Sequence, residues 1–318
     1  MIKSHSEIYC LCVTSVCFKI MLYLGSVNLE TYQILINEPM SKHTSFRVGG
    51  ICDKMLLPTS IDEIISAIQN CRKNNEKFFV MGNGSNLLVS DEGFRGTIIK
   101  ISKQFSTVEL RSQTEVYANA GILLSTLANF LLKHNLTGAE FVSGIPGTLG
   151  GALFMNAGAY GSELKDIVTS VTALTDKNEI KVIPNEQCEF AYRSSKMQRD
   201  KTIILGASLT LSLSEYNLIK EQMQHLNKMR AEKQPLNYGS AGSTFKRPEG
   251  RFAGKLIQDA GLSGYTIGEA AVSEKHCGFI INKGNASAND ILALIHYVQK
   301  TVLEKFNIEL HPEVQILD

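Results

Sequence analysis

Apolar residues recur along the chain at two intervals, which predict a mixture of helices and strands. The helical interval is found in four segments: 60–74, 122–135, 214–234 and 286–306. Ser60 and Glu63 have capping-box spacing at the start of the first segment, and Ser287 is expected to cap the last. Ser214 is expected to cap the third helix, which Pro235 would end.

Short apolar runs bounded by turn residues predict the strands. These runs are 77–81, 96–102, 114–121, 170–176, 179–184, 202–213 and 308–317. The fourth and fifth are expected to form a hairpin across 176–178. The helices and strands do not alternate in a regular βαβ order, so the pattern predicts an α+β protein rather than a doubly wound sheet. The pattern changes after Pro235, which indicates a domain boundary nearby.

The N-terminus does not share this pattern. Residues 8–24 are mostly apolar but are interrupted by Lys19, and the run is short for a membrane span. It also has no clear signal-peptide cleavage site. Residues 1–29 are therefore expected to be an extension that is either disordered or not part of the native protein, with Met21 as the alternative start. The remaining length suits two to three domains.

Charge and cysteine content exclude several classes of protein. The formal net charge is +1, which gives no general attraction to nucleic acid or anionic membranes. The seven cysteines include no CxxC pair, so no metal site is expected. Scattered cysteines in odd number favour reduced thiols and a cytoplasmic location.

Two glycine-rich loops have the composition of anion-binding sites. The first glycine loop is Gly82–Asp91, and the second is Gly144–Gly161. Neither matches the P-loop, and Leu87 stands where a dinucleotide fingerprint would have its third glycine. We expect Pro146 at the first position of a helix whose free N–H groups face an anion. The alternative is that these glycines only make tight turns and allow close helix packing, but two such loops favour a phosphate-bearing cofactor.

Three polar segments carry candidate catalytic side chains. Ser243 stands among small residues and is followed by Lys246 and Arg247, which suit a second anionic ligand such as a diphosphate. Arg193 lies in YRSS and Glu313 in HPEV. Each residue taken alone is more readily explained as part of a turn or a solvated surface. Together with a phosphate cofactor, a proton donor, a cation and a carboxylate suit a redox step that moves a proton.

In this order, the segments resemble one family over residues 30–318. SKHTSFRVGG, GNGSNLLVSD, SGIPGTLGGALFMNAGAYG, YRSS, SAGSTFKRPEG, VSEKHCGFIIN and HPEV are similar to the motifs of the UDP-N-acetylenolpyruvoylglucosamine reductases. The resemblance implies a vanillyl-alcohol-oxidase-type fold, with FAD-binding subdomains at 30–103 and 104–215 and a substrate domain at 216–318. It implies NADPH-dependent, FAD-mediated reduction of UDP-N-acetylglucosamine enolpyruvate in peptidoglycan synthesis. The short span after Arg193 resembles the subgroup that lacks an extra substrate-covering loop.

The resemblance also assigns residues to roles. Ser243 takes the place of the proton donor, while Arg193 and Glu313 take those of the groups that polarise the enolpyruvyl moiety. Tyr160, Lys246 and Arg247 are implied to contact substrate, and Thr44 and Gly49 to support the cofactor site. The implied FAD contacts are Arg47, Gly82, Asn83, Gly84, Ser85, Asn86, Gly144, Ile145, Pro146, Gly147, Gly150, Gly151, Asn156 and Gly158.

Two other functions compete with this assignment. One is a flavin oxidase of the same fold acting on an alcohol or sugar, and the other is a protein that binds flavin or a UDP-sugar without catalysis. The first has no need of Ser243 or the Lys246–Arg247 pair, and the second has no need of the catalytic trio. The FAD is expected to be non-covalent, because the glycine loops contain no His or Cys. A monomer is expected, with a dimer as the alternative.

Overall fold

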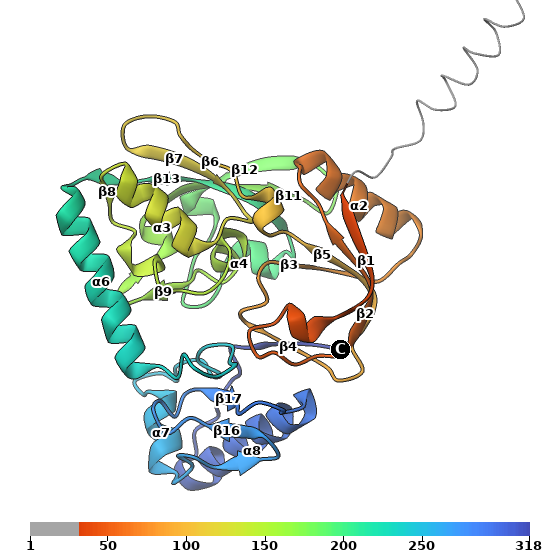
Figure 1. The fold of residues 1–318 in the computed structure, drawn as a ribbon, viewed down its shortest axis with the longest axis vertical. Helices are drawn as coiled ribbons and strands as arrows, with labels where there is room; N and C mark the ends of the chain where they lie inside the picture. The colour runs from red at the N-terminus through yellow and green to blue at the C-terminus, as the bar shows by residue number, and fades with distance from the viewer. Residues whose placement is uncertain (1–31) are drawn as a thin grey trace, which may run out of the picture. The chain divides into compact units, whose positions relative to one another are not determined.

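The computed structural model describes residues 32–318, and the expected extension at 1–29 lies outside the described residues. Contacts group Gln33–Asp318 into one unit. Within this unit two larger sheets, several short ladders and a C-terminal group of helices and strands are visible (Figure 1). The mixture of helices and strands confirms the α+β prediction. None of the helices within 32–318 has the length and apolar character needed to cross a membrane.

The first sheet has the order β1-β2-β5-β3. Its strands are β1 (Gln33–Pro39), β2 (Ile51–Leu57), β5 (Phe94–Lys100) and β3 (Phe78–Met81). β1 is antiparallel to β2, whereas β5 is parallel to both β2 and β3. Helix α2 (Ile61–Lys73) joins β2 to β3 and packs on β5 through its apolar face. The predicted cap is confirmed, because the Ser60 hydroxyl accepts the Glu63 N–H at 3.2 Å.

The second sheet is antiparallel and has the order β12-β11-β13-β7-β6. Its strands are β12 (Ile180–Pro184), β11 (Val168–Leu174), β13 (Ile203–Thr210), β7 (Glu115–Asn119) and β6 (Val108–Leu110). The expected hairpin is confirmed by the β11–β12 pairing. Helix α4 (Leu149–Phe154) packs on β13 and β7. Helix α4 is part of the second glycine loop. The sheet therefore holds this loop in place through α4.

Three helical predictions have different outcomes. Helix α3 (Leu124–Lys133) buries Leu124, Leu127 and Leu131 at the predicted helical spacing. Helix α6 (Tyr216–Lys233) is present, but its N-cap is Glu215 and no side chain caps it, so the prediction of a Ser214 cap is wrong. Ser214 lies one residue too early, and its N–H instead donates to the Asn135 carbonyl at 2.9 Å. The buried face of α6 packs on α3.

The predicted strand at 202–213 is divided in two. β13 ends at Thr210, and Ser212–Leu213 form β14, which pairs with β8 (Leu136–Thr137) outside the second sheet. The Leu211 N–H donates to the Thr114 carbonyl, so the chain turns away from the sheet at that point. A second short ladder pairs β9 (Gly158–Ala159), near the end of the second glycine loop, with β10 (Ser162–Glu163), which directly follows the loop.

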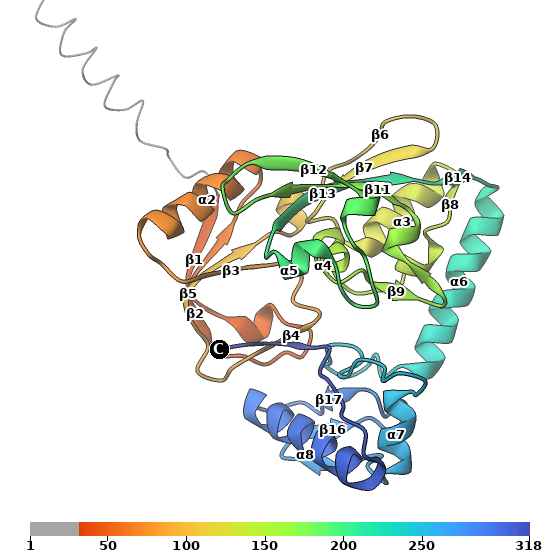
Figure 2. The same cartoon turned by 180° about the vertical axis from the view of Figure 1, so that it is seen from behind.

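The C-terminal elements pack around their own apolar core. They are α7 (Ala253–Asp259), β15 (Thr266–Ile267), β16 (Ala270–Val272), β17 (Ile280–Asn282) and α8 (Ala288–Phe306). The three strands form one sheet, which contacts α8 (Figure 2). Ser287 and Asp290 form a capping box at the start of α8, as predicted for the Ser287 cap.

This C-terminal core is continuous with the first subdomain. Phe46, Val48 and Leu88 belong to the same buried cluster as the α7 and α8 side chains. The predicted last strand is shorter than expected: only Gln315–Leu317 form β18, which pairs in parallel with β4 (Leu87–Val89). The end of the chain therefore returns to the first glycine loop. The domain limits at 103 and 215 remain predictions.

Asp91 is a further link between the first subdomain and α8. Its two carboxylate oxygens accept the N–H groups of Ala288 (2.7 Å) and Asn289 (2.9 Å) in the first turn of the helix. These are donors that the helix itself leaves unsatisfied, and a carboxylate there also interacts favourably with the helix dipole. A residue of the first glycine loop thus helps to fix the C-terminal domain.

Replacing Asp91 with alanine is expected to lower the free energy of unfolding by about 1–2 kcal/mol, the usual cost of losing a helix cap. Urea denaturation followed by circular dichroism would measure the change. The matched control is Glu92→Ala, which removes an exposed neighbouring carboxylate. Equal stability of the Asp91 variant and wild type would contradict the role of the cap.

Candidate active site

The first glycine loop contacts the SKHTSFRVGG segment and the second glycine loop. Gly84 has φ +65°, and its carbonyl accepts the Ser45 N–H at 3.1 Å. A Cβ on Gly84 would lie 2.0 Å from the His43 carbonyl oxygen, and one on Gly82 would lie 2.2 Å from Thr148 Oγ1. Gly84 must therefore be a glycine, and a side chain at Gly82 would displace the Thr148 hydroxyl. The structure therefore brings the SKHTSFRVGG segment and both glycine loops together.

The second glycine loop completes this contact from the other side. Gly147 has φ +140°, and a Cβ there would lie 2.9 Å from Ser85 Oγ. Gly150 packs against Ala120, whose carbonyl accepts its N–H at 2.8 Å. Part of the alternative explanation is therefore correct, because several of these glycines permit close packing. The exposed Gly151 faces no such contact.

The expected helix start at Pro146 is wrong. Thr148 is the N-cap of α4, and Leu149 is its first residue. The N–H groups of Leu149 and Gly150 donate to the carbonyls of Ile122 and Ala120, so they do not face a ligand. These carbonyls belong to the segment that directly follows strand β7. This segment is distant from α4 in sequence, so the local sequence does not reveal the pairing.

Two buried hydroxyl groups beside the first glycine loop have no hydrogen-bond partner among the described residues. They are Ser45 Oγ and Thr148 Oγ1. A buried polar atom without a partner is costly, which favours a ligand with acceptor atoms at this place. The residues present therefore fit a flavin dinucleotide held between the two loops. The sequence argument missed both residues, although each stands next to a motif position that it selected.

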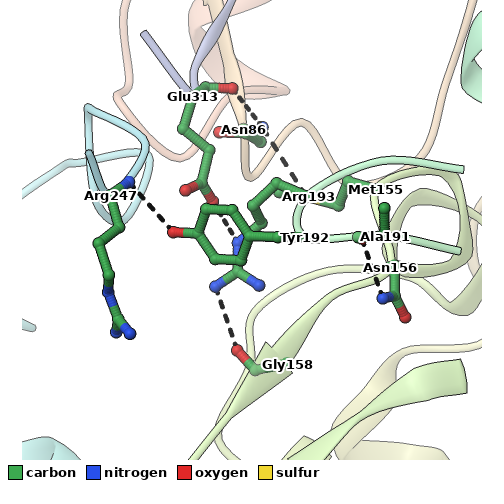
Figure 3. Close-up of polar contacts among 9 residues, drawn as sticks. All are labelled: Asn86, Met155, Asn156, Gly158, Ala191, Tyr192, Arg193, Arg247 and Glu313. Carbon is green, nitrogen blue, oxygen red and sulfur yellow. Dashed lines mark hydrogen bonds and ion pairs between the residues drawn. The ribbon is translucent and has the colours of Figure 1, made fainter. Parts of the chain in front are cut away.

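Arg193 and Glu313 form a close ion pair, as Figure 3 shows. Arg193 Nε lies 2.9 Å from Glu313 Oε1, and both side chains are mostly buried. Arg193 Nη2 also donates to the Gly158 carbonyl at 3.2 Å. Arg193 has φ +51°, so its backbone adopts the left-handed conformation that turns the side chain into this position. Residues 120 positions apart in sequence thus meet, and their catalytic roles stay predictions.

The segment of Glu313 is paired with that of Ser243. The Glu313 N–H donates to the Thr244 carbonyl at 2.8 Å, and Lys246 N–H donates to the His311 carbonyl at 2.9 Å. Asn86 Nδ2 donates to the Glu313 carbonyl at 3.0 Å. Ser243 itself is half-buried and directly precedes Thr244. The first glycine loop, the serine and the carboxylate are thereby held in one arrangement.

Burial raises the pKa of Glu313, and the neighbouring Arg193 and Lys246 oppose that rise without cancelling it. The physical reason is the cost of a charged carboxylate away from water. When protonated, Glu313 can donate a hydrogen bond as well as accept one.

This raised pKa predicts a pH-dependent stability. Between the ordinary value of 4.5 and the raised value, folded protein binds a proton that unfolded protein has released. The free energy of unfolding contributed by Glu313 therefore falls as the pH rises through that window. Glu313→Gln cannot ionise and is expected to lose this dependence. Urea unfolding from pH 4.5 upward would show a wild-type minus variant difference that declines with pH.

The control for this experiment is Glu309→Gln, an exposed carboxylate of the same segment. It is expected to follow the wild-type pH profile. A constant difference between wild type and the Glu313 variant would contradict the raised pKa.

Tyr192 and two of the predicted substrate residues, Arg247 and Tyr160, make contacts with other parts of the chain. Tyr192 Oη accepts the Arg247 N–H at 3.2 Å, and its ring lies 5.1 Å from the Arg193 guanidinium carbon (Figure 3). Arg247 is exposed, and its guanidinium lies over the Phe252 ring at 4.7 Å. Tyr160 is also exposed and donates its hydroxyl to the Leu226 carbonyl at 3.1 Å. Tyr192 therefore links the second subdomain to the SAGSTFKRP segment.

The remaining predicted cofactor residues have mixed surroundings. Arg47, Asn83 and Pro146 are exposed, while Ile145 is half-buried. Asn156 is fully buried, and its amide contacts Glu163, Ala191 and the Lys165 N–H. Because Ala191 lies two residues before Arg193, Asn156 braces the turn that carries the arginine. Individual contacts to FAD stay predictions.

Comparison with known proteins agrees with this architecture. Residues 53–183 match the family model described as FAD binding domain. Residues 234–317 match the model described as UDP-N-acetylenolpyruvoylglucosamine reductase, C-terminal domain.

Relatives and a solved structure match over most of the chain. A UDP-N-acetylenolpyruvoylglucosamine reductase of Caldanaerobacter subterraneus is 52% identical, covering 91% of this chain and 95% of its own. One from Alkaliphilus oremlandii is 49% identical, covering 89% of this chain and 93% of its own. The crystal structure of the Thermus caldophilus enzyme (MurB) superposes with a TM-score of 0.76 at 30% identity, covering 90% of this chain and 99% of that one. The chain therefore belongs to the UDP-N-acetylenolpyruvoylglucosamine reductase family.

Proposed function

We propose that this protein reduces UDP-N-acetylglucosamine enolpyruvate to UDP-N-acetylmuramate, with FAD as cofactor and NADPH as hydride donor. This reaction would supply a precursor of peptidoglycan. The observation that carries the proposal is the buried Arg193–Glu313 pair, held on a segment paired with that of Ser243. Family membership of the chain supports the same activity.

The two glycine loops would hold the cofactor. Ser45 and Thr148 offer unpaired hydroxyls beside Gly82 and Gly84, where backbone can approach a ligand closely. FAD, when bound, would accept hydride from NADPH and deliver hydride to the terminal carbon of the enol ether. The protein's own task is then to bind the substrate, to stabilise the negative charge that develops, and to supply a proton.

Arg193 would stabilise that negative charge. Its guanidinium is fixed by Glu313, the Gly158 carbonyl and the Tyr192 ring, so little reorganisation is needed during the reaction. Donors placed in advance at a site away from water are the most effective form of electrostatic catalysis. Glu313 keeps the guanidinium oriented and, in its protonated form, would donate to the substrate carboxylate.

Ser243 would give its hydroxyl proton to the carbon next to the carboxylate. A serine is a weak acid in water, so this role requires alignment and electrostatic help. Lys246 is half-buried and close enough to Glu313 to lower its pKa, and it therefore adds positive charge to the same region. Lys246, Arg247 and Tyr160 would contact the UDP moiety of the substrate.

A flavin oxidase of the same fold is the competing function. It would have no need of Ser243, of a carboxyl held beside Arg193, or of the Lys246–Arg247 pair. A binding protein without catalysis would likewise have no need to bury Glu313 against Arg193, because burying a charged pair is costly. The arrangement thus favours the reductase. We place the protein in the cytoplasm, and we expect a monomer.

The test is NADPH oxidation by the purified yellow protein without oxygen, with and without UDP-N-acetylglucosamine enolpyruvate. Sustained turnover only in the presence of that substrate is expected. A flavin that is reduced once and stays reduced in its presence would overturn the assignment and favour the oxidase. Purified protein that binds no flavin on reconstitution would remove both flavin functions.

A further inference from the structure

Arg230 lies on the face of α6 that contacts the start of the second glycine loop. Met223, Leu226 and Arg230 recur at helical spacing, and the first two are buried. A Cβ on Gly144 would lie 3.1 Å from Arg230 Cδ and 2.5 Å from Asn227 Oδ1. The aliphatic part of the arginine therefore occupies space that the absence of a side chain at Gly144 leaves open.

The guanidinium of Arg230 has no hydrogen-bond or ion-pair partner among residues 32–318, where its charge interacts with the Tyr160 phenol alone. Burial lowers its pKa from the ordinary value. The side chain is half-buried. The charge is thus partly withdrawn from water, and no acidic side chain of the described residues compensates it.

Such a charge is unfavourable unless a ligand supplies its counter-charge. Arginine presents five donors in a planar fork that matches the oxygens of a phosphate. On one side Arg230 adjoins Gly144, in the loop that would hold the flavin dinucleotide. On the other it adjoins Tyr160, which the resemblance assigns to the UDP moiety. The proposed function brings diphosphates to both places.

We propose that Arg230 binds a diphosphate group through its guanidinium, and that Gly144 is a glycine so that the arginine can reach this position. The inference rests on the proposed function, since FAD, NADPH and the UDP-sugar are the ligands that carry a diphosphate there. All three ligands offer the same chemistry to the arginine, so the experiment must separate them.

The experiment compares Arg230→Met with wild-type holoenzyme in three binding measurements. The first follows FAD release on dilution by the rise in flavin fluorescence. The second and third titrate the holoenzyme with UDP and with NADP⁺ by calorimetry, with uridine as a reference that has no phosphate. One of the three affinities is expected to fall by about tenfold to a hundredfold, the usual loss for a charge-assisted hydrogen bond. Uridine binding is expected to stay unchanged.

The ligand whose affinity falls identifies the source of the diphosphate. The matched control is Lys228→Met, which removes an exposed cation from the same helix and is expected to change none of the three affinities. Arg230→Lys retains the charge without the fork and is expected to lose less affinity, which keeps the test valid if the methionine variant folds poorly. Unchanged affinity for all three ligands in both variants would overturn the proposal.

Failure of this inference is distinct from failure of the proposed function. Binding is measured in the absence of turnover, so it can succeed or fail whatever the reaction. Wild-type protein that turns over the UDP-sugar while the Arg230 variants bind every ligand normally would refute only the arginine's role.

Discussion

Ser243→Ala is expected to slow oxidation of the reduced flavin by UDP-N-acetylglucosamine enolpyruvate by about 10²- to 10⁴-fold, the usual contribution of a positioned acid. Reduction of the flavin by NADPH is expected to change by less than about threefold, because no proton from Ser243 is used in that half-reaction. Anaerobic stopped-flow absorbance of the flavin would follow the two half-reactions separately.

The matched control for this substitution is Ser240→Ala. Ser240 belongs to the same SAGS segment, and its backbone N–H pairs with the Ser45 carbonyl. The control is expected to leave both half-reactions near wild-type rates. Equal slowing of both half-reactions in the Ser243 variant would mean that the serine supports the cofactor site rather than the proton transfer.

The glycine positions of the candidate site and two helix caps were predictable because they depend on local chemistry. Glycines at Gly84 and Gly147 reflect backbone with positive φ and close approach, and both constraints leave a trace in composition. Caps such as Ser60 and Ser287 are also local, since the side chain and its N–H partner are three residues apart. Their prediction needed no knowledge of the tertiary structure.

Features that depend on long-range contacts were not predictable in the same way. The start of α4 was misplaced because Ile122 and Ala120 accept the N–H groups of Leu149 and Gly150 from another part of the chain. The return of β18 to β4 and the Asp91 cap of α8 join segments more than 190 residues apart in sequence. No local pattern encodes these pairings.

The pKa of Glu313 was predictable only in part. A raised pKa for Glu313 could be expected from the role that the resemblance assigns to it. Its physical cause is burial that outweighs the adjacent Arg193 and Lys246, which only the folded chain reveals. The unpaired Arg230 had no signal in the sequence, because it looks like one of several cations along a polar helix.

Arg193→Ala is expected to slow oxidation of the reduced flavin by substrate by about 10²- to 10³-fold, in the range found when one preorganised donor is removed. Unlike Ser243→Ala, it is also expected to weaken binding of the enolpyruvyl substrate, because the guanidinium attracts the substrate carboxylate before the reaction as well as during it. Stopped-flow rates as a function of substrate concentration would separate the two losses.

Loss of Arg193 also changes its partner. Arg193 lowers the pKa of Glu313, so its removal should raise that pKa further and leave the carboxyl neutral over a wider pH range. Added guanidinium ion should therefore restore part of the rate in Arg193→Ala by occupying the space beside Glu313. The control is Arg95→Ala, whose exposed side chain pairs with Asp53 on the first sheet and whose loss should change neither rate nor binding. An Arg193 variant with normal substrate oxidation would show that the ion pair serves folding alone.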